Sequence, residues 1–188
     1  MNNDKEIKKL QHSYDVWYRD ANRGKTVSSS HNYDQNLKIV ATFDTVQKFW
    51  AVYTHLVRPN ELTRHSDLHI FKSGIKPLWE DEANKNGGMW KLRVRKGLAS
   101  RLWENLLLAY IGEQFKIDDE ICGVVISCRY QEDYLSVWNR NGQDSESIQK
   151  IKQTLKRVLD LPKNTLLEYK QHSDALRKIR NQNRVDKE

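Results

Sequence analysis

The chain has 188 residues, and its 32 Lys and Arg against 25 Asp and Glu give a formal net charge of +7. This length allows one domain with a sizeable core and argues against two. No apolar stretch is long enough to span a membrane, and the first residues lack the pattern of a signal peptide. The basic excess is compatible with an anionic partner such as nucleic acid. We expect Cys122 and Cys128, six apart in one apolar strand pattern, to lie on the same side as buried free thiols of a soluble intracellular protein.

Alternating apolar residues predict two strands, at about 10–18 and 37–43, separated by a loop rich in Gly and Ser that ends at Tyr33. A helix follows, with Asp44 or Thr45 as its N-cap. Its apolar residues recur at helical spacing and predict one continuous apolar stripe made of Val46, Phe49, Trp50 and Tyr53.

A short strand is expected at 67–71, followed by a loop around Trp79 and by another strand at 90–95. On this last strand the apolar residues alternate with three cations, so that Lys91, Arg93 and Arg95 share one face. Three cations on one strand face suit an anion-binding surface, and they suit a solvent-exposed sheet face equally well.

Two further helices are predicted at about 100–115 and 145–159, with a strand pair at 121–130 and 134–139 between them and a last strand at 165–170. Most links between consecutive strands are too short for a parallel crossover. The order therefore predicts an α+β domain with a mostly antiparallel sheet and with the helices packed on one face.

The loop at 76–88 is the most unusual local feature, because it places Trp79 beside Glu80 between a proline and two glycines. An indole offers a flat π-face, and a carboxylate is an acceptor-only group. Together they would suit a planar cationic ligand that carries N–H donors. The alternative is a Trp that plugs the edge of the sheet, with a solvated acidic turn behind it.

Catalytic motifs are missing from the sequence. We find no phosphate-binding glycine loop, dinucleotide fingerprint, nucleophile elbow or His-Glu-x-x-His helix. The acidic runs at 80–82 and 118–120 lack the alternating ligand spacing of a calcium loop. We therefore predict a binding module with no catalytic residue, no metal site and no cofactor.

Five motifs occur in order along the chain: Phe43 to Trp50, Gly74-Ile75-Lys76-Pro77-Leu78-Trp79-Glu80-Asp81, Gly87 to Trp90, Ile121 to Val125, and Leu159 to Pro162. Together they resemble the eukaryotic translation initiation factor 4E family, whose members bind the 7-methylguanosine cap of mRNA. The residues at 79–88 and 95–101 are most similar to the class II branch, called 4E homologous protein. The resemblance covers about 10–174, most of the chain.

The resemblance implies a curved antiparallel sheet with three long helices on its convex face and the cap on its concave face. Residues 1–9 would then form a flexible N-terminal segment, 10–174 a single cap-binding domain, and 175–188 a basic C-terminal tail. The implied cap-binding residues are Tyr33, Trp79, Glu80, Arg129, Arg177 and Lys178, to which the cationic strand face adds Arg93. The implied surface for a Tyr-x-x-x-x-Leu-Φ helix of an initiation scaffold or a 4E-binding repressor consists of Val46, Trp50, Leu108 and Gly112.

Three departures from the family pattern predict weaker cap binding. Tyr134 replaces a Lys, Met89 replaces an Arg, and Tyr33 replaces a Trp. We therefore favour a cytoplasmic, monomeric regulator that binds capped mRNA and acts with a partner as a repressor of selected mRNAs. The alternatives are an initiation factor that recruits the scaffold to particular mRNAs and, from a different class, a hydrolase that processes the cap.

Overall fold

The computed structural model describes residues 6–20, 36–174 and 177. Its strands form one seven-stranded sheet in the order β2-β1-β3-β5-β6-β4-β7, and each neighbouring pair is antiparallel. They are β1 (Lys9–Asp20), β2 (Leu37–Thr45), β3 (Ser66–Lys72), β4 (Gly88–Arg95), β5 (Ile121–Cys128), β6 (Glu132–Asn139) and β7 (Leu167–Gln171). The helices are α2 (Val46–Tyr53), α3 (Ala99–Ile111) and α4 (Ser145–Val158), with a 3-10 turn η1 (Pro59–Glu61).

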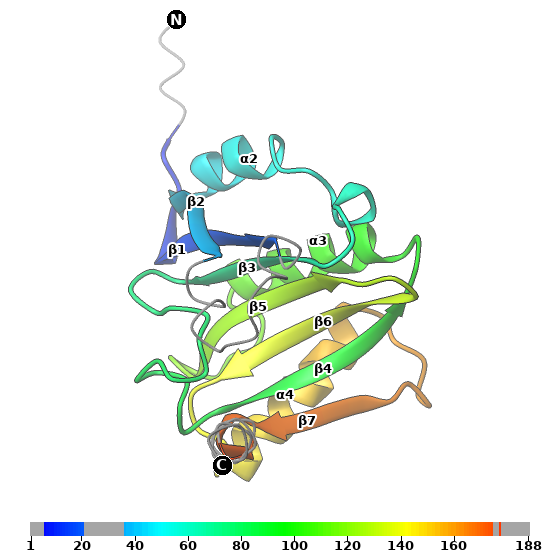
Figure 1. Cartoon of the computed structure of the whole chain (residues 1–188). Helices are drawn as coiled ribbons and strands as arrows, with labels where there is room; N and C mark the ends of the chain where they lie inside the picture. Colours follow the sequence, from blue (N-terminus) through cyan, green and yellow to red (C-terminus); the bar gives the residue numbers. More distant parts are fainter. Residues whose placement is uncertain (1–5, 21–35, 175–176, 178–188) are drawn as a thin grey trace, which may run out of the picture.

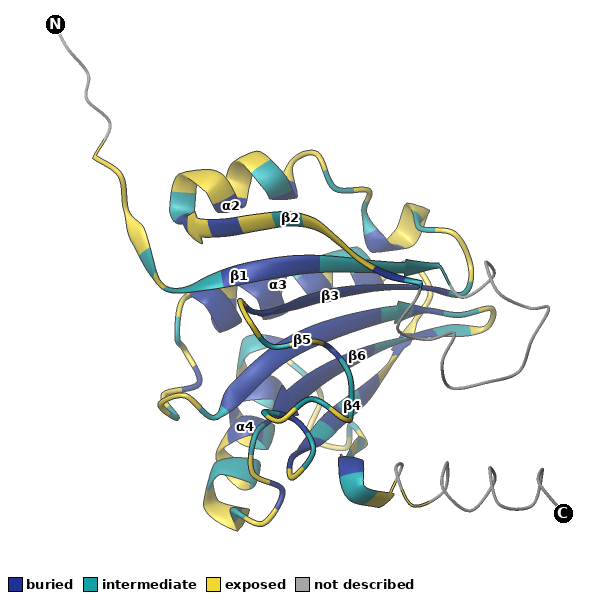
Figure 2. Ribbon diagram, turned by 60° about the vertical axis from the view of Figure 1, so that its left-hand side comes forward, coloured by how far each residue is buried: buried dark blue, intermediate teal, exposed yellow. Residues whose placement is uncertain are grey.

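The α+β prediction is confirmed, because the sheet curves and α3 and α4 lie behind it in Figure 1. The main core fills the space between these helices and the sheet, and it includes Trp103 and Leu107 of α3 and Ile151 of α4. Burying each such side chain stabilises the fold by roughly 1.5–3 kcal/mol. Figure 2 shows this buried layer along the middle strands and the inner sides of the helices. No helix in the described part of the chain is long and apolar enough to cross a membrane.

Helix α2 is shorter than expected, with eight residues, and its apolar stripe is divided between two sides. Thr45 is the N-cap, and its hydroxyl oxygen accepts a hydrogen bond from the Lys48 backbone N–H at 3.1 Å. Phe49 and Tyr53 are buried in the main core, whereas Trp50 remains 41% exposed. The core therefore covers only part of the predicted apolar stripe, because α2 packs on the sheet through Phe49 and Tyr53 and leaves Trp50 exposed.

Strand β5 contains a register irregularity between Ile121 and Gly123. A bulge of this kind changes the face toward which the following side chains point. Cys122 consequently packs in a small cluster on the open face of the sheet, while Cys128 lies in the main core. Both are buried free thiols as predicted, but the expectation that they share one side is wrong.

Candidate functional site

The face of the sheet opposite the helices carries an apolar end and a charged end. The strand register aligns three cross-strand rows on this face. They are Phe71, Gly123, Trp138 and Met89; then His69, Val125, Ser136 and Lys91; then Asp67, Ser127, Tyr134 and Arg93. Because adjacent rows are two residues apart along each strand, their spacing is roughly 7 Å. The two ends therefore lie within the span of one nucleotide-sized ligand.

Trp79 lies at the apolar end. It packs, half-buried, against a cluster that includes Phe71, Val125 and Trp138. Gly123 makes room for this cluster, because a Cβ atom at that position would lie 2.3 Å from the Phe71 ring. The underlying sheet thus supports one side of the Trp79 side chain while the loop leaves part of it accessible.

The Trp79 loop is held by side chains that lie inside it. Asn84 is fully buried, and its Nδ2 donates to the carbonyl oxygens of Lys76 and Leu78, both at 2.8 Å. Asp81 accepts from the backbone N–H groups of Lys76 at 3.0 Å and Ala83 at 2.9 Å. Such side-chain bonds to the local backbone replace the missing strand or helix ladder. The loop is therefore preorganised around Trp79.

The three consecutive acids of this loop have different roles. Asp81 holds the backbone, as described above, and Glu82 forms an ion pair with Lys85 at 2.6 Å. Glu80 is exposed and has no ion pair with any residue in the described ranges. It is therefore the carboxylate next to Trp79 that is available to a ligand.

His172, which follows β7, anchors the base of the loop. Its Nδ1–H donates to the Asn84 carbonyl oxygen at 2.9 Å, and its backbone N–H donates to the Gly87 carbonyl oxygen at 3.0 Å. Its ring also contacts that of Trp138, with the centroids 4.4 Å apart. Burial lowers the pKa of His172 to about 4, so the imidazole is neutral at neutral pH. The C-terminal segment thus begins beside the Trp79 loop.

The charged end is organised by Asp67, which is 2% exposed. Arg19 Nε donates to its Oδ2 at 2.8 Å, and Arg129 Nη2 lies 2.7 Å from its Oδ1. Burial alone would raise the pKa of Asp67, but neighbouring His69, Arg19 and Arg129 outweigh it and lower that pKa. One buried carboxylate therefore orients two guanidinium groups and leaves a net positive charge at this end.

Arg129 lines a cavity of about 500 Å³, together with Lys91, Ser127 and Tyr134. The ammonium of Lys91 lies 3.8 Å from the centroid of the Tyr134 ring. Arg93 shares the cationic face but is 75% exposed, does not line the cavity, and pairs with Glu132 at 3.3 Å. As predicted, Lys91, Arg93 and Arg95 share one face of β4 that is at least partly exposed. Of these three cations, Lys91 lines the cavity and Arg93 does not.

Several predicted site residues are brought together here. Trp79 and Glu80 lie on the anchored loop, and Arg129 lies at the charged end of the same sheet face. Arg177 is exposed beyond β7, while Tyr33 and Lys178 lie outside the described residues. Met89 packs with the apolar cluster under Trp79 and so extends the apolar end. Among the described residues no group of His, Cys, Asp and Glu side chains is arranged to hold a metal ion.

The predicted partner surface lies on the helices. Trp50 is 41% and Leu108 37% exposed, and Val46 is partly exposed one turn before Trp50. Arg58 links α2 to α3, because it lies 4.1 Å from the Tyr53 ring centroid and 3.7 Å from Glu104. Gly112 caps α3 and is exposed. These apolar groups therefore stand on a surface that the core leaves uncovered.

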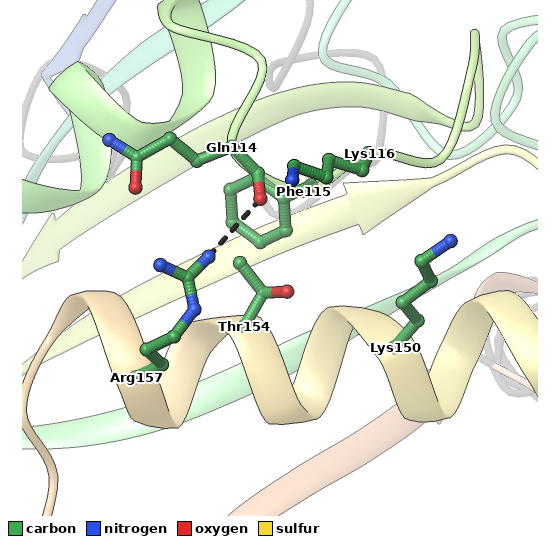
Figure 3. Close-up of a pocket in the computed structure, with 6 residues that line it drawn as sticks. All are labelled: Gln114, Phe115, Lys116, Lys150, Thr154 and Arg157. Atoms are coloured by element: carbon green, nitrogen blue, oxygen red, sulfur yellow. Dashed lines mark hydrogen bonds between the residues drawn. The ribbon is translucent and has the colours of Figure 1, made fainter.

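A second cavity, of about 440 Å³, lies between the end of α3 and α4 (Figure 3). Arg157 reaches across it and donates to the Gln114 carbonyl oxygen at 3.2 Å. It is lined by helix residues and by the segment after α3, and it contains none of the predicted site residues.

Sequence reasoning missed Asn84, His172 and the pair of Arg19 and Asp67. In the sequence Asn84 and Asp81 look like ordinary turn residues, and their hydrogen bonds to the loop backbone are visible only in three dimensions. The contact of Arg19 with Asp67 depends on strand register, which local patterns do not specify. Lys91 could have been found from the sequence, since it belongs to the row of three cations predicted on one strand face.

Comparison with known proteins agrees with this geometry. A family model described as eukaryotic initiation factor 4E matches residues 9–187. Translation initiation factor 4E-4 of Caenorhabditis elegans is 48% identical over 168 residues, covering 89% of this chain and 78% of that protein. Translation initiation factor NCBP of Triticum aestivum is 45% identical over 162 residues, covering 86% and 68%.

Solved structures are also similar. A complex of C. elegans eIF4E-3 with the 4E-binding protein Mextli and a cap analogue has a TM-score of 0.84 at 37% identity, covering 90% of this chain and 95% of that chain. Ascaris suum eIF4E-3 with an m7G cap has a TM-score of 0.79 at 37% identity, with 89% and 92% coverage.

Proposed function

The chain belongs to the eukaryotic initiation factor 4E family, and from this premise we propose that it binds the 7-methylguanosine cap of mRNA on its open sheet face. Members of this family are cap-binding factors and not enzymes, so the predicted lack of catalytic activity follows from the family. The same assignment argues against a cap-processing hydrolase.

The observation that carries the proposal is the exposed Glu80, which forms no ion pair with the described residues and lies beside Trp79 on an anchored loop. Methylation at N7 gives guanine a positive charge, so stacking on an indole gains a cation–π contribution of roughly 0.5–2 kcal/mol. Glu80 would accept from the guanine N1–H and the exocyclic amine, which are both donors. Tyr33 would supply the second stacking ring. The proposed contacts to the phosphates come from Arg129, Arg93, Arg177 and Lys178.

Tryptophan fluorescence titration tests this function. We expect 7-methyl-GTP to quench the emission of Trp79 and GTP to have little effect, because only the methylated base carries the ring charge. Trp79→Ala should abolish the quench. Trp50→Phe, on the helical side, should retain it. An equal response to 7-methyl-GTP and GTP would contradict the proposal.

We further propose a class II role, in which a weakly cap-binding protein acts in the cytoplasm with a partner to repress selected mRNAs. Met89 in the apolar cluster and Tyr134 in the charged cavity support it, because neither adds a cation to the phosphate end. The exposed Trp50 and Leu108 suit the partner's Tyr-x-x-x-x-Leu-Φ helix.

The same surface would serve recruitment of the initiation scaffold. Tethering the protein to a reporter mRNA separates the two roles, since repression lowers reporter translation and recruitment raises it.

Trp50→Ala is expected to weaken binding of such a helical peptide at least about thirtyfold, the loss typical of an aromatic hot spot. Cap binding should stay unchanged, because α2 lies away from the Trp79 loop (Figure 1). Fluorescence anisotropy of a labelled peptide measures the loss, and Leu166→Ala, which truncates a residue that is 89% exposed, is the matched control. If Trp50→Ala instead unfolds the protein, Trp50 serves the core and the prediction fails.

A further inference from the structure

Lys91 is the cation of the β4 row that lines the charged cavity. Its neighbours on that face, Arg93 and Arg95, are exposed and do not line it. The side chain of Lys91 is partly buried, and its ammonium lies over the Tyr134 ring at 3.8 Å from the centroid. A cation held over a ring gives up mobility without being neutralised. Lys91 is therefore positioned by an uncharged partner.

Charge pairing distinguishes Lys91 from the other cations at this end. Arg129 is paired with Asp67 at 2.7 Å, and Arg93 with Glu132 at 3.3 Å. Lys91 has no carboxylate within ion-pair distance among the described residues. Burial lowers the pKa of Lys91, and the charges of Lys170, Arg129 and Arg93 lower it further while Glu168 opposes them. An anion in the cavity would relieve this repulsion.

The strand register places Lys91 in the same cross-strand row as Val125, beside the apolar end. It pairs with Ser136 of β6, which pairs in turn with Val125 of β5. Val125 belongs to the cluster under Trp79, and Ser127, two residues further along β5, lines the cavity with Arg129. A chain of phosphates that leaves a base stacked on Trp79 toward Arg129 would therefore pass Lys91.

We propose that Lys91 binds the phosphate chain of the capped nucleotide together with Arg129, and that the Tyr134 ring holds its ammonium in place. This inference rests on the proposed cap-binding function. Tyr134 then has a positioning role. It stands where the family pattern has a lysine, whose cation would contact the phosphates directly. The charged end then contains a cation contributed by β4 instead of by β6.

The test compares Lys91→Gln with the intact chain against three ligands: 7-methylguanosine, 7-methyl-GMP and 7-methyl-GTP. We expect Lys91→Gln to weaken 7-methyl-GTP binding about tenfold, the loss of one charge-assisted contact. Binding of 7-methylguanosine should stay within about twofold, because the base site is untouched. The affinity of the variant for 7-methyl-GTP should also depend less on salt, since one fewer charge contributes.

Arg95→Gln is the matched control, because it removes a cation from the same strand face outside the cavity. Tyr134→Phe should retain binding, since it keeps the ring, whereas Tyr134→Leu should reproduce much of the Lys91→Gln loss. Unchanged 7-methyl-GTP affinity of Lys91→Gln would overturn the inference alone. Equal binding of GTP and 7-methyl-GTP by the intact chain would overturn the proposed function as well.

Discussion

Replacing Glu80 with Gln is expected to weaken 7-methyl-GTP binding about 100-fold, close to 3 kcal/mol, because two charge-assisted hydrogen bonds are lost or reversed. A glutamine has the same shape, but its amide nitrogen would face the donors of the guanine edge. Fluorescence or calorimetric titration measures the change. The fold should not respond, because Glu80 is exposed and forms no ion pair with the described residues.

Glu82→Gln is the control for this variant. It removes the same charge from the same loop, at a carboxylate that already pairs with Lys85. We expect its affinity for 7-methyl-GTP to stay within about threefold of the intact chain, since an exposed ion pair contributes little. Thermal unfolding of both variants should coincide with that of the intact chain. If Glu80→Gln and Glu82→Gln weaken binding equally, net loop charge rather than base recognition explains the effect.

Most of the elements could be predicted because their signals are local. The alternation in β4 and the helical spacing in α4 depend on residues close in sequence, and the observed bounds differ from the expected ones by a few residues. The sheet order and the bulge at Cys122 could not be predicted, because they depend on pairings between distant segments. The division of the α2 stripe has the same origin, since only packing decides which apolar residues are covered.

The candidate site divides in a similar way. Trp79 and Glu80 were identified by an unusual local combination and by a family resemblance. The residues that position them were not. His172 reaches Asn84 across 88 residues of sequence, and the bonds of Asn84 to the loop backbone depend on how the loop folds around its buried side chain. Likewise Arg19 and Asp67 are 48 residues apart and meet only through strand register. Sequence therefore indicates the groups that would touch a ligand better than the groups that orient them.

Acid is expected to destabilise the fold strongly between about pH 6.5 and pH 4, owing to two buried histidines. Burial lowers the pKa of both His69 and His172 to about 4, against about 6.5 in the unfolded chain. The unfolded state therefore binds more protons in this range, and the free energy of unfolding falls as the pH is lowered. Each histidine contributes up to about 3 kcal/mol to this loss.

Asp67 acts in the same direction at lower pH. Its pKa is lowered in the fold, so the stability that it contributes is lost as the pH falls through that value. The loss from the two histidines, up to about 3 kcal/mol each, is comparable with the roughly 5–15 kcal/mol that stabilises a whole domain. Urea unfolding at pH 7.5, 5.5 and 4.5, at constant ionic strength, measures it. A free energy of unfolding that stays constant across this range would contradict the prediction.

His69→Phe separates the contribution of one histidine from the rest. The neutral His69 ring is buried beside Phe71, and neither of its nitrogens has a hydrogen-bond partner among the described residues. A phenylalanine should therefore be tolerated at pH 7.5 while flattening the pH dependence by about half, because only His172 remains. Since His172 also anchors the Trp79 loop, cap affinity of this variant should still decline as His172 gains its proton. A pH profile identical to that of the intact chain would exclude His69 as a source of acid sensitivity.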